Sequence, residues 1–413
     1  MPTILAYQSF RYLAIALCSI FNWTQVSYQT FQPIGADMVA DAVLGQPNFT
    51  SDETNGGGVR AASLNVPWGT AIDSATGRLY VADTSNHRVL SWSSAAAVTN
   101  GQAADLVIGQ PNFFSNEPNQ GSSEPNAGTL NGPIAVTVDN MRNLYVADQD
   151  NNRVLIYANP AELDTLADWV VGQPGFTSSI EWATASGLRG PWGVVVDRQA
   201  NLYVSDSGNH RVLQYRNVLT SDQAADRVFG QPNFTSVVAN NGGVSASSLF
   251  FPAGVTIDQA DTLYIADSGN HRVLVYYLPL NSDQVADRVF GQPNFTSNAA
   301  PTGGVSATTL RTPTDVALDR RGNMYVTDFG SNRVLVFNTP ANGDSVADYV
   351  FGQPSFSSDG ANVPSITAGT LHAPAGIDID QAGNVYVADT LNSRILRYDT
   401  PIPFQVYLPL TIC

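Results

Sequence analysis

A sixfold internal repeat limits the folds open to this chain more than any other feature of its sequence. The tripeptide Gly-Gln-Pro occurs six times, and so does a proline that opens an apolar stretch. These prolines follow one another at spacings of 66, 58, 61, 61 and 61 residues and are Pro67, Pro133, Pro191, Pro252, Pro313 and Pro374. A period of this length indicates one structural unit that is copied and that packs against its neighbours.

Each copy contains four short segments with the composition of β-strands. In the third copy they are residues 193–197, 202–206, 211–215 and 225–234. β-Branched and aromatic residues alternate in them, and Gly, Asn and Asp bound them, as is typical of strands joined by turns. Four antiparallel strands in each of six units predict an all-β fold, a six-bladed β-propeller.

The two ends of the repeat predict how the ring closes. The last copy has only three strand segments, and a segment like the missing fourth, residues 40–49, precedes the first copy. We therefore expect this N-terminal strand to complete the last blade and to close the ring. The propeller would span residues 37–399, after a leader of residues 1–36 and before a tail of residues 400–413. The tail is expected to add an edge strand or to lie across one face.

The leader and the charge bear on location and partners. An apolar run at residues 12–21 has the length of a signal-peptide core and is too short to span a bilayer. We predict an exported or cell-surface bacterial protein, a monomer without a membrane span in the propeller. The net charge is −16 and all 19 basic residues are arginine, which disfavours nucleic acid and leaves room for a cation or a basic partner. The two cysteines, Cys18 and Cys413, provide no disulfide framework.

The turn between the second and third strands is rich in residues that could carry chemistry. In the third copy it reads Asp-Ser-Gly-Asn-His-Arg, but the histidine position holds Asn or Ser in three of the six copies, and neither titrates near neutral pH. Asp and Arg occur in every copy, which predicts a structural clasp of the hairpin. The pairs are Asp83 and Arg88, Asp148 and Arg153, Asp206 and Arg211, Asp267 and Arg272, Asp328 and Arg333, and Asp389 and Arg394.

Positions at which the copies differ are better candidates for a site. Trp68 and Trp192 follow the proline in two copies, where the other copies have smaller residues. Two interpretations are open: the tryptophans anchor a ligand, or they pack locally against their neighbours. Asp315 and Asp378 are acidic departures on the same side of the first strand in adjacent copies, and His372 lies just before that strand. These three side chains could bind a divalent cation. The long loops before each proline would form a binding rim or simply pack on the blade.

The copies resemble NHL repeats, through the Pro-x-Gly strand, the Leu-Tyr-Val-Ala-Asp strand and the Asn-x-Arg-Val turn. The resemblance implies the propeller fold, but such propellers include protein and peptide binders, RNA binders, sensors and some enzymes. Our first hypothesis is a non-catalytic module without a cofactor that recognises a protein, peptide or glycan through the loops of one face. The alternative is a hydrolase or lyase that uses calcium or zinc at the central channel, as six-bladed lactonases and amidating lyases do.

Overall fold

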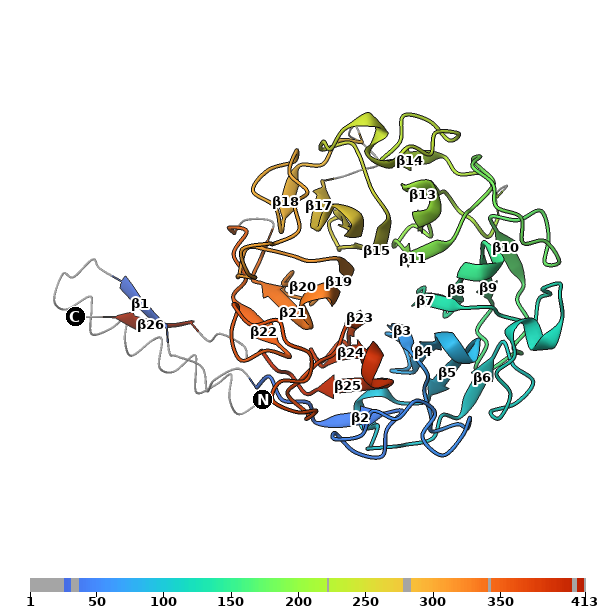
Figure 1. The fold of residues 1–413 in the computed structure, drawn as a ribbon, viewed down its shortest axis with the longest axis horizontal. Coiled ribbons are helices and arrows are strands. Elements are labelled where there is room, and N and C mark those ends of the chain that lie inside the picture. The colour runs from blue at the N-terminus through green and yellow to red at the C-terminus, as the bar shows by residue number, and fades with distance from the viewer. Residues whose placement is uncertain are drawn as a thin grey trace. The chain divides into compact units, whose positions relative to one another are not determined.

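Six four-stranded antiparallel sheets surround a central axis in the computed structural model, which describes residues 26–30, 37–220, 223–277, 284–340, 343–402 and 407–411 (Figure 1). This confirms the predicted six-bladed propeller. The apolar run at residues 12–21 and both cysteines lie outside the described residues, so export stays a prediction. No helix in the described part of the chain is long and apolar enough to cross a membrane.

Each blade has an inner strand, two middle strands and an outer strand. The inner strands are β3 (Pro67–Ile72), β7 (Pro133–Val138), β11 (Pro191–Val196), β15 (Pro252–Ile257), β19 (Pro313–Leu318) and β23 (Pro374–Ile379). The second strands are β4 (Leu79–Asp83), β8 (Leu144–Asp148), β12 (Leu202–Asp206), β16 (Leu263–Asp267), β20 (Met324–Asp328) and β24 (Val385–Asp389). The third strands are β5 (Arg88–Trp92), β9 (Arg153–Tyr157), β13 (Arg211–Tyr215), β17 (Arg272–Tyr276), β21 (Arg333–Phe337) and β25 (Arg394–Tyr398). The outer strands are β6 (Leu106–Ile108), β10 (Trp169–Val171), β14 (Arg227–Phe229), β18 (Arg288–Phe290), β22 (Tyr349–Phe351) and β2 (Ala42–Leu44).

Short 3-10 turns join the second and third strands. They are η1 (Thr84–Asn86), η4 (Gln149–Asn151), η5 (Ser207–Asn209), η7 (Ser268–Asn270), η8 (Phe329–Ser331) and η9 (Thr390–Asn392), and three more lie elsewhere, η2 (Ala95–Ala97), η3 (Pro118–Gly121) and η6 (Ala239–Gly242). The residue after each joining turn has left-handed backbone, for example His210 with φ of 55°. Asn and His tolerate this conformation better than most residues, which favours them at that position.

The ring closes through its first strand. β2 pairs with β25, so the last blade has the order β2-β25-β24-β23 and combines both ends of the propeller. Residues 43–44 thereby pair with residues 395–396, more than 350 positions away. The predicted ring closure is confirmed, and no blade is left with an unpaired fourth position.

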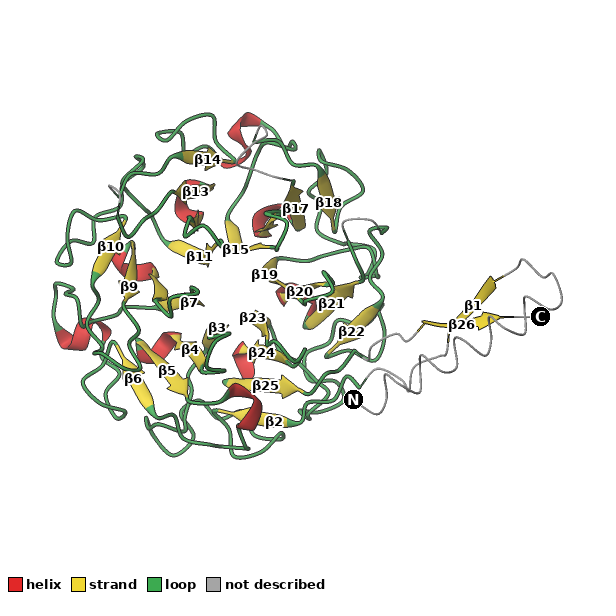
Figure 2. Cartoon of the chain, turned by 180° about the vertical axis from the view of Figure 1, so that it is seen from behind, coloured by secondary structure: helices red, strands yellow, loops and turns green. Residues whose placement is uncertain are grey.

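Figure 2 shows the blades side by side around the axis. The hydrophobic core lies between neighbouring blades. One cluster joins blades 2 and 3, with Tyr145, Ile156 and Val204 among its buried members, and equivalent clusters join other adjacent blades. Each middle strand contributes side chains to both of its sheet's faces, which explains why these strands are buried along their length. Stacking the blades thus buries sheets that could not cover themselves.

A two-stranded pair lies outside the propeller unit, which comprises Met38–Asp399. β1 (Val26–Thr30) pairs antiparallel with β26 (Tyr407–Thr411), so part of the leader pairs with part of the tail. The tail therefore adds its strand to the leader, and this strand is not an edge strand of a blade.

Candidate functional site

The predicted tryptophans meet at one end of the channel. Trp68 and Trp192 begin inner strands of blades 1 and 3, and their rings touch edge to face with centroids 5.0 Å apart. Phe329, from η8 in blade 5, stacks on Trp68 at 5.6 Å, and Phe251 packs against Trp192 at 5.7 Å. We call these four residues the aromatic cluster. Both tryptophans are half-buried, so they pack on one another and still present ring surface.

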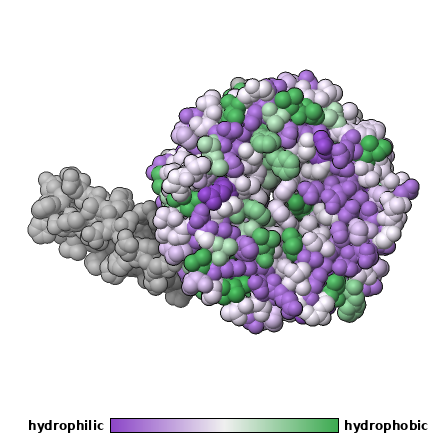
Figure 3. All heavy atoms as spheres, viewed as in Figure 1, coloured by the Kyte–Doolittle hydropathy of each residue, from purple (hydrophilic) through white to green (hydrophobic). Residues whose placement is uncertain are grey.

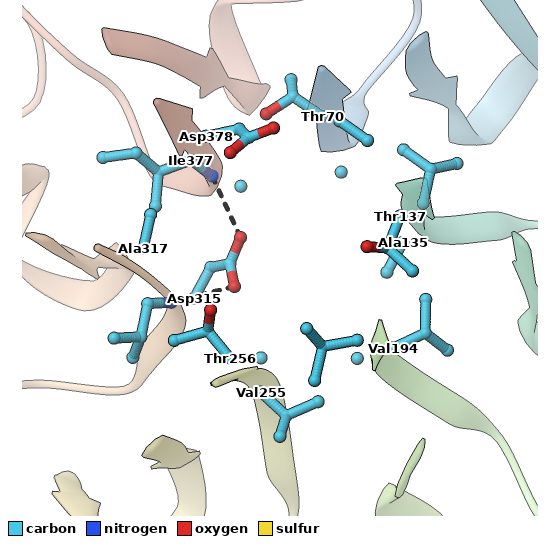
Figure 4. Close-up of a pocket in the computed structure, with 18 of the residues that line it drawn as sticks. Thr70, Ala135, Thr137, Val194, Val255, Thr256, Asp315, Ala317, Ile377 and Asp378 are labelled. Carbon is cyan, nitrogen blue, oxygen red and sulfur yellow. Dashed lines mark hydrogen bonds between the residues drawn. The ribbon is translucent and has the colours of Figure 1, made fainter. Parts of the chain in front are cut away.

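The two predicted carboxylates lie in the channel below this cluster, on adjacent inner strands (Figure 4). Asp315 accepts backbone N–H groups from Val316 at 2.9 Å and from Ile377, in the next blade, at 3.0 Å. Asp378 does the same with Ile379 and with Ile72 of blade 1, both at 2.7 Å. Each carboxylate therefore links its own inner strand to that of the following blade.

Both channel carboxyls have raised pKa values. Burial raises the pKa of Asp315 to about 7, and the nearby Asp378 adds to the rise, while two backbone N–H groups oppose it. Burial likewise raises the pKa of Asp378 to about 7, against its own two N–H donors. Removal from water disfavours the charged form of a carboxyl unless a cation compensates it. This pair therefore changes its charge near neutral pH.

His372 does not join the two carboxylates. It precedes the proline of β23, its backbone N–H donates to Oδ1 of Asp389 at 2.7 Å, and it is not among the residues that line the channel cavity. Among the described residues, no three His, Cys, Asp or Glu side chains lie close enough together to hold a metal ion. The three residues of the predicted metal site are thus not brought together.

The repeated Asp and Arg form buried ion pairs. In all six blades Arg Nε donates to Asp Oδ2 at 2.6–2.8 Å, and both side chains are 0% exposed. Arg211, for example, also donates to the carbonyl oxygens of Phe234, Thr184 and Gly187. Since Thr184 and Gly187 belong to the long loop before the inner strand, the pair holds this loop as well as the hairpin.

Comparison with known proteins agrees with this repeat structure. The model of the teneurin NHL domain matches residues 44–275, more than half of the chain, and the model of the NHL repeat matches residues 310–337. This chain belongs to the NHL-repeat family. NHL repeat-containing protein 2 from Homo sapiens is 26% identical over 381 residues, which cover 84% of this chain and 48% of that protein.

Other matches show the extent of the similarity. Protein SUPPRESSOR OF QUENCHING 1, chloroplastic, from Arabidopsis thaliana is 25% identical. The matched region covers 81% of this NHL protein but only 30% of the Arabidopsis protein. The chain thus spans half or less of these curated relatives. A solved protein of unknown function from Bacteroides thetaiotaomicron superposes with a TM-score of 0.55 at 15% identity, over 86% of this chain and 75% of that one. This last likeness concerns the fold alone.

The histidine position of the NHL turn carries a hydrogen bond between blades that the sequence did not reveal. Nδ1 of His210 accepts the backbone N–H of Phe251 in the next blade, at 3.2 Å. His87 and His271 accept equivalent N–H groups at 3.0 Å, and Asn152 and Asn332 do so through Oδ1 at 2.8 Å. The property that five copies share is an acceptor atom at one position, which either residue provides. In the sequence, the signal of this bond is that His and Asn, which occupy this position in five copies, both carry a side-chain acceptor.

The long loops of the NHL propeller are held by repeated contacts. The Gln of each Gly-Gln-Pro donates to a carbonyl of its loop, as Gln231 does to Val238 at 2.9 Å. In four blades an Asn of the loop and the Asn of the turn exchange amide hydrogen bonds, for example Asn240 and Asn270 at 2.7 and 3.0 Å. The leucine before each proline is fully buried: Leu64, Leu130, Leu188, Leu249, Leu310 and Leu371. The loops are therefore a packed part of each blade, and only their outer residues are available for recognition.

The face that carries these loops and turns, which we call the top face, is partly apolar and acidic. Ile180, Trp182, Val238, Phe250 and Phe251 of its loops are between 36% and 60% exposed. These loops and turns contain seven acidic residues besides the clasps and only three arginines, and Arg189 and Arg311 are paired with loop acids. Figure 3 shows that hydrophobic residues on one face of the propeller lie in small groups around a central hollow.

Proposed function

We propose that this NHL propeller is a binding module whose top face recognises a protein segment that carries basic and apolar residues. The observation that supports this most directly is the aromatic cluster at the channel mouth, with Phe251 40% exposed and both tryptophans half-buried. Aromatic side chains held by their neighbours lose little conformational entropy on binding, and they are enriched at the centres of protein interfaces.

The charge of the same face supports a basic partner. Asp52, Glu53, Glu117, Glu124 and Asp150 are exposed there and form no ion pair with any described residue. Complementary charge steers association and disfavours wrong partners, so an acidic rim selects for arginine or lysine. The absence of lysine from the whole sequence and the net charge of −16 act in the same direction at longer range.

The test is selection of binders from a random peptide library, followed by affinity measurement on wild type and matched variants. Phe251→Ala and Trp192→Ala alter the top face, and other blades already hold Ala at these positions, as Ala373 and Ala253 show. Met141→Ala is the control, since Met141 lies in the turn between β7 and β8 at the opposite face and is 60% exposed.

We expect selected peptides to contain basic and apolar residues and to bind the two top-face variants at least about tenfold more weakly, because truncating a central anchor costs about 2 kcal/mol or more and a tenfold change corresponds to about 1.4 kcal/mol. The Met141→Ala variant should bind as wild type does. Peptides that bind all three variants equally would show that the top face is not the recognition surface. Selected peptides without basic residues would overturn the proposed preference for a basic partner.

A further inference from the structure

The channel contains a cavity of about 170 Å³ that is larger than a single water requires, roughly 10–15 Å³ by the same measure. All six inner strands contribute to its wall, and Trp68 and Trp192 line the end at which their rings meet. Figure 4 shows Asp315, Asp378, Thr70, Thr137 and Thr256 around this space, on strands of five different blades. The wall of the cavity therefore combines these five polar side chains with aliphatic ones, and one end of the cavity is aromatic.

The two carboxylates in this cavity have no cation beside them. Among the described residues no ion pair involves Asp315 or Asp378, whereas each of the six buried clasp aspartates has its own arginine. The hydrogen bonds of the half-buried Asp315 and Asp378 carboxylates come from backbone N–H groups. Both carboxylates are partly exposed to the cavity, and a bound cation would offset the cost of holding two partly desolvated carboxylates without a positive partner.

A third group in the cavity has no partner. The hydroxyl of Thr70, a residue that is only 7% exposed, makes no hydrogen bond with any described residue. Thr70 lies on β3, the strand whose Ile72 N–H binds Asp378, and both residues line the cavity. Buried hydroxyl groups nearly always have a partner, so the Thr70 hydroxyl is available to a ligand in the cavity, as an acceptor or as a donor.

We propose that the channel cavity binds a small organic ammonium ion, a primary amine in its protonated form. An ammonium group has three N–H donors, which match Asp315, Asp378 and the Thr70 hydroxyl, and the indole rings at the end of the cavity attract positive charge. The cavity shares Trp68 and Trp192 with the top-face site, but Asp315, Asp378 and Thr70 belong to the cavity alone, so variants of these three residues test it independently.

The same geometry favours an ammonium ion over a metal ion. All four carboxylate oxygens already accept one backbone N–H each, which leaves one lone pair on each oxygen for a further partner. Calcium takes six to eight oxygen ligands, and the described residues offer no third acidic or histidine ligand. An ammonium ion would donate one N–H to Asp315, one to Asp378 and one to the Thr70 hydroxyl, and each of these bonds needs only one remaining lone pair.

The experiment is calorimetric titration of the whole protein with n-propylammonium chloride at pH 8, where the carboxylates are charged, at constant ionic strength. Propanol, the neutral probe of the same size, and calcium chloride are titrated in parallel. Variants Asp378→Asn and Thr70→Val remove one acceptor each. Asp164→Asn is the matched control, because Asp164 is an exposed acid in the loop between β9 and β10 and belongs neither to the cavity nor to the top face.

We expect saturable binding of propylammonium, none of propanol, at least tenfold weaker binding by both cavity variants, and unchanged binding by Asp164→Asn. Binding should also weaken at pH 6. Thr70→Val keeps both carboxylates, so it tests the site even if Asp378→Asn does not fold. Absence of saturable binding to wild type, unchanged binding by Thr70→Val, or calcium binding that displaces the amine would each overturn the proposal.

Discussion

Replacing one buried arginine of the clasp, Arg211→Ala, tests the energetic role of the repeated ion pair. The guanidinium donates to Oδ2 of Asp206 at 2.6 Å and to three carbonyl oxygens, and neither charged side chain contacts solvent. The alanine variant leaves a buried carboxylate with only the N–H of Arg189, at 2.7 Å, and the amide of Asn209, at 2.9 Å.

The expected loss follows from the burial of the pair. Removing one partner of a buried ion pair costs about 3–5 kcal/mol, because the other charge remains desolvated. An exposed pair contributes less than about 1 kcal/mol. Burial already raises the pKa of Asp206, and Arg211 is the largest influence that lowers it, so its loss moves the carboxyl further toward the neutral form. A domain with a stability of about 5–15 kcal/mol would lose a large part of it.

The assay is urea-induced unfolding at pH 7.5, with free energies compared only where the slopes agree. Arg189→Ala is the control, since Arg189 pairs with Glu181 at 2.9 Å with both side chains more than half exposed. A second variant, Arg211→Met with Asp206→Leu, removes both charges and should lose less than Arg211→Ala alone. A loss below about 1 kcal/mol for Arg211→Ala, or equal losses for Arg211→Ala and Arg189→Ala, would refute the reasoning.

Two further substitutions test contacts between blades. Burial lowers the pKa of His271 below its ordinary 6.5, so the stability gained from its neutral Nδ1 is complete above pH 6.5 and is lost as the pH falls toward the lowered value. His271→Asn keeps an acceptor that does not titrate. The melting temperature of this variant should match that of wild type within about 2 °C at pH 8 and should exceed it at pH 5. A pH dependence identical to that of wild type would contradict this prediction. At Gly376 an added Cβ would lie 2.1 Å from the carbonyl oxygen of Trp68, so Gly376→Ala should cost about 1–3 kcal/mol in urea unfolding. Gly243→Ala, with nothing within 4 Å of the new Cβ, should cost little, and equal costs would show that the inner strands can separate.

The fold was predictable because each copy repeats the same local signals. Pro133, Pro191 and their equivalents open inner strands, and the turn residues set hairpins whose Asp and Arg lie opposite one another in the register, as Asp206 and Arg211 do. Closure also followed from counting strands, since β2 had no other place in a complete ring. These inferences need only contacts within a copy or between identical copies.

The candidate site was only partly predictable because it depends on contacts between unlike copies. The sequence located Asp315 and Asp378 as departures, but not that each binds an N–H of the next inner strand. It also grouped His372 with them, although the backbone of His372 serves the clasp of Asp389. The position of a residue along a strand predicts which face of the sheet its side chain is on. The group to which that side chain hydrogen-bonds depends on the neighbouring blade.

The aromatic cluster shows how such differences are coordinated around the ring. Trp68 and Trp192 stand in blades 1 and 3, and the blades beside them hold smaller residues at the same position, including Ala253 and Ala375. In blade 5 that position holds Thr314, which donates to the carbonyl of Ala375 at 2.9 Å, and the aromatic ring comes from the turn, as Phe329. The rings of Trp68, Trp192 and Phe329 come from alternate blades and can meet over the channel because the intervening blades hold smaller residues at this position, while Phe251 joins them from the loop of blade 4. A substitution at Ala253 or Ala375 by a large residue would therefore disturb the mouth even though neither residue belongs to the cluster.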